Sequence, residues 1–297
     1  MDETSMIIAD VDLDSIVYLN GDFIRLADAK VSVLDRGFIF GDGIYDVVPA
    51  YGGKPFRMDG HLARLERCLA AIGIRNPYSR HTWEQLVLDM LARSGRGGDC
   101  IVYIQVTRGV AKRDHAFPKK EVPTTVFLMV SPFTRSQADR EQGVKAVCIE
   151  DIRWLRCDIK SVSMLGNVLA KQAAVEAGVD EVLQFREDQL SEAAACNVWI
   201  VKDSVLLAPM RNNLILEGIR YGLIQELAAK AGIEFQARNI TRAEVLSADE
   251  IMISSATKEI LSVVELDGVP VGQGVPGQIF KKLRQGYDQA ILSLEQV

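Results

Sequence analysis

The alternation of hydrophobic and polar residues predicts a chain in which short strands mix with amphipathic helices. Apolar runs of roughly four to eight residues indicate strands, and apolar residues about three or four positions apart indicate helices. The expected strands are 16–19, 23–26, 100–107, 124–130, 144–149, 181–185, 250–254 and 263–266. The expected helices are 60–72, 82–93, 164–178, 219–232 and a last one from about residue 276. Asn20-Gly21, between the first two strands, is a strong signal for a two-residue hairpin turn.

A polar stretch divides this pattern into two parts. Residues 131–143, SPFTRSQADREQG, are mostly polar and are interrupted by proline and glycine, which is typical of a linker. A chain of 297 residues is long enough for two domains of ordinary size. We therefore expect an N-terminal extension at 1–14, an N-terminal domain at 15–132, a linker at 133–143 and a C-terminal domain at 144–297.

Composition and charge argue against some classes of partner and indicate the cellular compartment. The charged fraction of 25% and the hydrophobic fraction of 48% are ordinary for a globular protein, and a net charge of −6 argues against a nucleic-acid partner. The five cysteines are scattered and form no CxxC pair, which favours reduced thiols over disulfides or a metal site. The acidic N-terminus lacks the apolar core of a secretory signal, and no run reaches the ~18 apolar residues of a membrane span. We expect a cytoplasmic protein without a membrane partner.

The chemistry is expected to centre on Lys160. The run 149–173, IEDIRWLRCDIKSVSMLGNVLAKQA, places this lysine at the end of a strand or loop, just before the helix 164–178, which we expect to be buried. A lysine held there away from water becomes a usable nucleophile or base, whereas a solvated surface lysine is the ordinary alternative. Between Ile149 and Ile159 the stretch before it carries several charged residues, among them Asp151, Arg153, Arg156 and Asp158.

This segment resembles the cofactor-lysine segment of D-amino acid aminotransferases, within the fold-type IV family of pyridoxal phosphate enzymes. EDIRWLRCDIKS and LG.VLAKQ carry the resemblance here, and further motifs extend it from about Val17 to near Tyr287. It implies an α/β (α+β) fold of two domains with pyridoxal 5′-phosphate at their interface, in a homodimer whose partner helps to close the site. It also implies that Lys160 forms the Schiff base with the cofactor and moves the Cα proton of the substrate.

Other motifs supply the residues that would bind the cofactor. HLARL matches a family motif whose arginine, Arg64 here, binds the phosphate, although a solvated arginine would be usual on a helix surface. LSEAAACN matches a motif whose glutamate, Glu192 here, contacts the pyridine nitrogen; an ordinary turn glutamate is the alternative. Two more segments, LILEGIRY and SSATKEI, match the remaining positions of the cofactor site, which are Leu216, Ile219, Arg220, Ser255 and Ala256.

Several of these positions depart from the pattern of the family. Alanines occupy 193–195, where glycine and serines are common, Arg220 replaces a threonine, and Ala256 lacks a hydroxyl group. Backbone amides at a helix N-terminus still bind an anion after such changes, and Arg220 either reaches the phosphate or points away. The departures leave a catalytically silent homologue as an alternative, but Lys160 and Glu192 are both retained.

Two motifs concern the substrate. RGFIFGDGIYDVV matches a signature whose tyrosine, Tyr45 here, faces the substrate, and VTRGVAKRDHAFP matches a carboxylate trap formed by Arg113 and His115. A core aromatic and a solvated basic loop are the respective alternatives. L-specific branched-chain aminotransferases lack the Arg-x-His arrangement, which also argues against an aminodeoxychorismate-type lyase. The resemblance therefore implies ping-pong transamination between a D-amino acid such as D-alanine and a 2-oxo acid, either 2-oxoglutarate or pyruvate.

Overall fold

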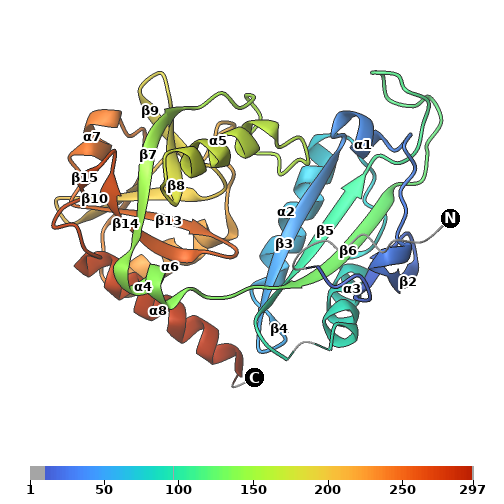
Figure 1. Ribbon diagram of the computed structural model, residues 1–297, viewed down its shortest axis with the longest axis horizontal. Helices are drawn as coiled ribbons and strands as arrows, with labels where there is room; N and C mark the ends of the chain where they lie inside the picture. The colour runs from blue at the N-terminus through green and yellow to red at the C-terminus, as the bar shows by residue number, and fades with distance from the viewer. Residues whose placement is uncertain (1–10, 96, 296–297) are drawn as a thin grey trace.

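The computed structural model describes residues 11–95 and 97–295, which form two lobes that each contain one β-sheet (Figure 1). Residues 1–10 of the expected extension lie outside the described residues. Helices pack on both sheets, which confirms the mixed α/β (α+β) class. No helix in the described ranges is long and apolar enough to cross a membrane.

The first lobe is built on a sheet of six strands. Its strands are β1 Ile16–Leu19, β2 Asp22–Arg25, β3 Gly43–Tyr51, β4 Lys54–Pro55, β5 Cys100–Thr107 and β6 Thr125–Pro132. Its helices are η1 Leu26–Asp28, α1 Arg36–Phe40, α2 Met58–Ala71 and α3 Arg80–Arg93. The strand order is β2-β1-β6-β5-β3-β4, with every pair antiparallel, and Asn20-Gly21 turns the β1–β2 hairpin as predicted. Alternate residues of β5 are buried, because α2 and α3 pack on this sheet.

The second lobe is built on a mixed sheet. Its strands are β7 Val144–Glu150, β8 Glu181–Arg186, β9 Gln189–Ala193, β10 Asn197–Lys202, β11 Val205–Ala208, β12 Phe235–Ala237, β13 Glu250–Ser255, β14 Glu259–Leu266 and β15 Val269–Pro270. Its helices are α4 Gln137–Gln142, α5 Leu165–Glu176, α6 Ile219–Lys230, α7 Arg242–Leu246 and α8 Gln278–Glu295. The order is β12-β11-β10-β13-β14-β7-β8-β9, with β15 paired to β14. Parallel strands need a long crossover, and the one between β7 and β8 contains both Lys160 and α5.

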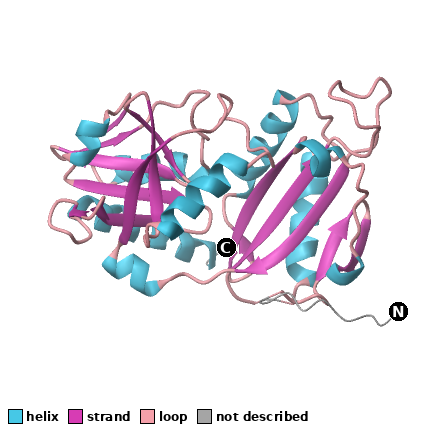
Figure 2. Cartoon of the chain, turned by 45° about the horizontal axis from the view of Figure 1, so that its top comes forward, coloured by secondary structure: helices cyan, strands magenta, loops and turns pink. Residues whose placement is uncertain are grey.

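Aromatic side chains hold the two lobes together. Tyr51 and Phe56 of the first lobe belong to the same buried cluster as Tyr287 of α8. The ring centroids of Phe56 and Tyr287 are 5.7 Å apart, a spacing at which aromatic pairs attract one another. Figure 2 shows the strands of the two sheets as two separate groups. The cluster therefore fixes the position of one sheet relative to the other.

The expectation that the helix after Lys160 is buried was wrong. In α5, Leu165, Val168 and Leu169 are 71%, 59% and 49% exposed. The residues that α5 buries are the small Ala170 and Ala174, which pack against the second sheet. Hydrophobic periodicity identifies an apolar face, but it does not say whether this chain or another molecule covers that face.

Candidate active site

One cavity of about 410 Å³ is lined by side chains from both lobes, and this volume is within the ordinary range for small-molecule sites. Most of the residues predicted from the sequence lie around it. These are Tyr45, Arg64, Lys160, Glu192, Leu216, Ile219, Arg220, Ser255 and Ala256. Arg113 and His115 do not line it.

The backbone around Lys160 is hydrogen-bonded to strand β3, which forms part of the cavity wall. The segment after β7 crosses to the first lobe, where the Tyr45 amide donates to the Lys160 carbonyl at 3.0 Å and the Val162 amide donates to the Gly43 carbonyl at 3.0 Å. The Lys160 amine lies 3.9 Å from the centre of the Tyr45 ring, which in turn stacks on Tyr103. Backbone pairing therefore fixes the lysine, and an aromatic face supports its amine.

Asp46, His61 and Arg64 form a buried ionic cluster beside the cavity. His61 and Arg64 lie three residues apart on α2, so they share one helix face. Arg64 donates from Nε and Nη2 to the two oxygens of Asp46 at 2.8 Å each, and His61 Nδ1 lies 2.7 Å from Asp46 Oδ1. Burial alone would raise the pKa of Asp46, but Arg64 and His61 hold it well below its usual range. Neither Asp46 nor His61 was assigned a role from the sequence, although the three-residue spacing was a usable signal.

The pKa of His61 makes stability depend on pH. Burial lowers this pKa to about 4, against a raising effect of Asp46. Between about pH 6.5 and pH 4, His61 is therefore protonated in the unfolded chain but neutral in the folded protein. The stabilising effect is complete above the unfolded pKa and is lost as the pH falls through this window, by about 3 kcal/mol in total.

We expect urea unfolding at a series of pH values to show this loss in the wild type. His61→Asn should show a weaker pH dependence, because the titrating ring is gone. His81→Asn, which removes an exposed histidine on α3, should retain the wild-type slope. Identical slopes for His61→Asn and the wild type would contradict the assignment of a neutral buried His61.

The wall of the cavity that contains Ile219 and Arg220 has features that favour an anion. Helix α6 begins at Ile219, and its N-cap residue, Gly218, makes no side-chain cap, so the first amides remain available. A Cβ atom at Gly218 would lie 2.1 Å from Asn197 Oδ1, so a larger residue there would displace the Asn197 side chain, which donates to Glu192. Arg220 is 1% exposed, yet its Nε and Nη1 atoms have no hydrogen-bond partner among the described residues, and the same holds for His61 Nε2. Arg220 Nη2 donates to the Ala256 carbonyl at 3.4 Å, and the guanidinium group lies 5.1 and 5.8 Å from the centres of the Phe56 and Tyr287 rings. Two donors of this buried cation are thus still unsatisfied within the described ranges, which fits a bound anion at this wall.

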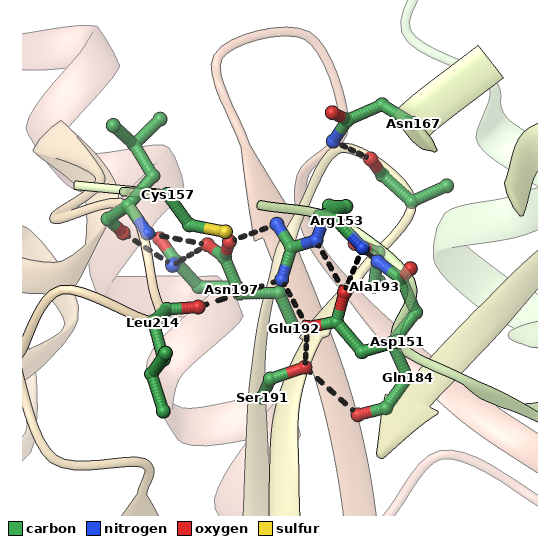
Figure 3. A network of polar contacts seen from close by, with 12 residues as sticks. Asp151, Arg153, Cys157, Asn167, Gln184, Ser191, Glu192, Ala193, Asn197 and Leu214 are labelled. Atoms are coloured by element: carbon green, nitrogen blue, oxygen red, sulfur yellow. Dashed lines mark hydrogen bonds and ion pairs between the residues drawn. The ribbon is translucent and has the colours of Figure 1, made fainter. Parts of the chain in front are cut away.

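Glu192 is buried at the end of β9, where it accepts three hydrogen bonds. Its Oε1 accepts from the Leu216 amide and from Asn197 Nδ2 at 3.0 Å each, and its Oε2 accepts from Arg153 Nη1 at 2.6 Å (Figure 3). Burial raises the pKa of Glu192 to about 7, although Arg153 opposes this shift. Arg153 and Asn197 were not predicted from the sequence as supports of this carboxylate. Asn197 ends the matched motif, but nothing in the spacing indicated the Arg153 contact.

Arg113 and His115 lie on an exposed but well-supported loop between β5 and β6. The buried Arg36 donates to the carbonyl oxygens of Asp114 and His115 at 2.6 and 3.4 Å. Both predicted side chains are exposed and lie near the Phe40 ring, with a centroid separation of 5.4 Å for His115. The structure therefore brings them to one another, but not to the cavity of their own chain.

Comparisons with known proteins agree with this geometry. The family model for amino-transferase class IV matches residues 43–266. A D-alanine aminotransferase of Staphylococcus epidermidis is 41% identical over 279 residues, which cover 93% of this chain and 98% of that protein. A branched-chain aminotransferase of Thermoproteus uzoniensis, solved with norvaline, superposes with a TM-score of 0.86 at 25% identity, over 95% of this chain and 96% of that one.

The fold also matches a second branched-chain aminotransferase, from T.th., that was solved with pyridoxamine 5′-phosphate. That structure has a TM-score of 0.88 at 24% identity, with 95% of each chain covered. The family match covers most of this chain and includes Tyr45, Arg64, Lys160 and Glu192. The chain therefore belongs to the class IV aminotransferase family.

Proposed function

We propose that this protein is a pyridoxal phosphate-dependent aminotransferase that transfers the amino group of D-amino acids, D-alanine among them, to a 2-oxo acid. The acceptors proposed are 2-oxoglutarate and pyruvate, with ping-pong kinetics. The observation that carries the proposal is that Lys160, Glu192 and the anion-binding wall around Arg220 line one cavity. The 41% identity with a D-alanine aminotransferase supports the choice of substrate.

The residues of the cavity fit the cofactor. Arg64, Arg220 and the first amides of α6 would hold its phosphate, together with Ser255 and the backbone of Ala256. Glu192 would face the pyridine nitrogen, and the backbone of Leu216 fixes that carboxylate. Lys160 would bind the cofactor covalently. When bound, pyridoxal phosphate accepts the electron pair released as the Cα proton of an amino acid leaves.

The other roles in the proposed reaction fall to side chains of this protein. The Lys160 amine takes the Cα proton as a general base and returns it as a general acid, over the face of the Tyr45 ring. Glu192 stabilises a proton on the ring nitrogen, and Tyr45 orients the substrate from the cavity wall. Arg113 and His115 would bind the substrate carboxylate through charge-assisted hydrogen bonds.

Because Arg113 and His115 do not reach their own cavity, we propose that they serve the cavity of a second copy in a homodimer. Large hydrophobic side chains are exposed near α1 and α5, which lie along the same edge of the molecule in Figure 1. They are Val33, Leu34, Phe38, Trp154, Leu155, Leu165, Val168 and Leu169. Exposed apolar surface of this kind supports a protein interface. The expected mass in solution is twice the 32.8 kDa of one chain.

The domain limits 15–132 and 144–297, with 133–143 as the linker, also remain our proposal. Each sheet lies within one of these ranges, although α4 occupies part of the linker. A cytoplasmic location is likewise proposed. All five cysteines lie within the described residues, and none is in a disulfide, which supports a reducing compartment.

The half-reaction with each enantiomer of alanine tests the proposed function. The cofactor-loaded protein should be yellow, and D-alanine alone should replace the visible band with that of the pyridoxamine form, with release of one pyruvate per site. L-alanine in a separate cuvette should leave the band unchanged. A response to L-amino acids only would instead indicate a branched-chain aminotransferase. A protein that stays colourless in excess cofactor would indicate the silent homologue.

A further inference from the structure

The segment before Lys160 contains a buried arginine to which the proposed function gives no role. Arg153 lines the cavity, and its side chain is 6% exposed. Its Nε and Nη2 atoms donate to Asp151 at 3.0 and 2.9 Å, and its Nη1 atom donates to Glu192 at 2.6 Å. Figure 3 shows the guanidinium group between the two carboxylates. All three guanidinium nitrogens are therefore engaged, two by Asp151 and one by Glu192.

Asp151 is fixed in its turn, so Arg153 has little freedom to move away. The Asp151 carboxylate accepts from the Ser191 hydroxyl at 2.7 Å and lies 3.1 Å from Arg186 Nη2. Its backbone amide donates to the Phe185 carbonyl at 2.7 Å, next to β8. The hydrogen bonds of Arg153 hold the pKa of Asp151 at about 2, although burial opposes them. Asp151 is therefore a permanent anion that anchors Arg153 in one orientation.

Glu192 lines the cavity, and its hydrogen bonds leave an acceptor site on one oxygen. Oε1 already accepts two donors, the Leu216 amide and Asn197 Nδ2. Oε2 accepts only Arg153 among the described residues, and a carboxylate oxygen has about two acceptor sites. A ring N–H that reaches Glu192 from the cavity would therefore share Oε2 with Arg153.

Because Arg153 and the ring N–H would share Oε2, Arg153 affects whether the proton lies on the ring nitrogen or on Glu192. Glu192 is 5% exposed, and a carboxylate this deeply buried takes up a proton unless a cation offsets the loss of water. We propose that Arg153 is a positioning residue that keeps Glu192 ionised and thereby keeps the ring nitrogen of the bound cofactor protonated. The proposal rests on the proposed function. Without Arg153 the proton would leave the ring nitrogen, its N–H bond would break and an O–H bond would form at Oε2.

The matched pair Arg153→Met and Arg156→Met tests this inference. Arg156 forms the same kind of two-bond pair with Asp158, at 2.9 and 3.0 Å, but on the surface, where its side chain is 49% exposed. Each variant and the wild type would be loaded with pyridoxal phosphate labelled with ¹⁵N in the ring. We expect a protonated ring nitrogen in the wild type and in Arg156→Met, and the resonance of an unprotonated pyridine in Arg153→Met.

Kinetics provide a second readout in the same proteins. Loss of one charge-assisted hydrogen bond of ~1.5–3 kcal/mol predicts a fall in kcat of about 10- to 100-fold for Arg153→Met. The KM for D-alanine should change little, because Arg153 contacts Glu192 rather than the carboxylate trap. A protonated ring nitrogen in Arg153→Met would overturn the inference while leaving the proposed function intact. A wild type that binds no labelled cofactor would overturn the proposed function itself.

If Arg153→Met does not fold, Arg153→Lys provides the same test. Lysine keeps the positive charge but lacks the planar guanidinium group that donates to Asp151 from two nitrogens and to Glu192 from the third. We expect the folded variant to release its ring proton at a lower pH than the wild type in a ¹⁵N titration. An unchanged titration midpoint would contradict a role for Arg153 in setting the proton affinity of Glu192.

Discussion

Replacement of Lys160 by alanine is expected to lower kcat for D-alanine by at least the ~10²–10⁴-fold that a general acid–base supplies. The amine that moves the Cα proton is lost, and so is the covalent attachment of the cofactor. Lys160 sits over the Tyr45 ring with its backbone fixed by the Tyr45 amide. The amines of Lys171 and Lys258, which also line the cavity, are hydrogen-bonded to the Asp180 carbonyl and to Glu181. Stopped-flow absorbance and pyruvate formation would measure both losses.

The matched control is Lys145→Ala, which removes a lysine on β7 that pairs with Glu265 at 3.0 Å and is 54% exposed. This variant should keep wild-type kinetics, because an exposed ion pair contributes little to stability. Lys160→Ala should also remain folded, since the fixed contacts of Lys160 are made by its backbone. Retention of wild-type kcat in a folded Lys160→Ala variant would contradict the role given to this lysine.

The second large effect concerns the loop that carries Arg113 and His115. Replacing either with alanine is expected to lower kcat/KM for D-alanine by roughly 10- to 100-fold, because a charge-assisted hydrogen bond of ~1.5–3 kcal/mol to the substrate carboxylate is lost. The visible band of the loaded protein should not change, because these two side chains are proposed to bind the substrate carboxylate and not the cofactor. Lys112→Ala, a neighbouring exposed residue on the same loop, is the control and should be near wild type.

Mixed dimers would show which chain supplies the trap. A dimer of one Lys160→Ala chain and one Arg113→Ala/His115→Ala chain contains one site with all three residues if the loop serves its partner. Such a dimer, isolated by two affinity tags, should have about half the wild-type activity, since a two-fold dimer has two equivalent sites. If each loop served its own chain, both sites would be defective, and activity would not rise above that of the parent variants.

Much of the fold was predictable, because apolar and polar residues alternate regularly along several of its strands. β5 was predicted at its observed limits, and the strand predicted at 124–130 is observed as β6, Thr125–Pro132. The cavity also gathers Tyr45, Lys160 and Glu192 from separate motifs, as the resemblance implied. Local pattern sufficed here because hydrophobic alternation and turn residues act over a few positions.

Features that depend on long-range contacts were not predictable in the same way. The charged residues before Lys160 looked alike in the sequence, yet Arg153 is buried between two carboxylates while Arg156 is exposed. That difference depends on β9, which brings Glu192 to Arg153 from 39 positions away. The exposed face of α5 was misjudged for a related reason, since periodicity carries no information about a second chain.

The central claim is that Lys160 carries the cofactor, and borohydride reduction tests it most directly. Reduction of the loaded protein makes the lysine–cofactor bond permanent, and peptide mass spectrometry then locates the phosphopyridoxyl group. We expect this group on Lys160, and we expect it to be absent after pre-treatment with D-alanine, which converts the cofactor to its unattached pyridoxamine form. Labelling of Lys171 or Lys258, which also line the cavity, in place of Lys160 would contradict the central claim.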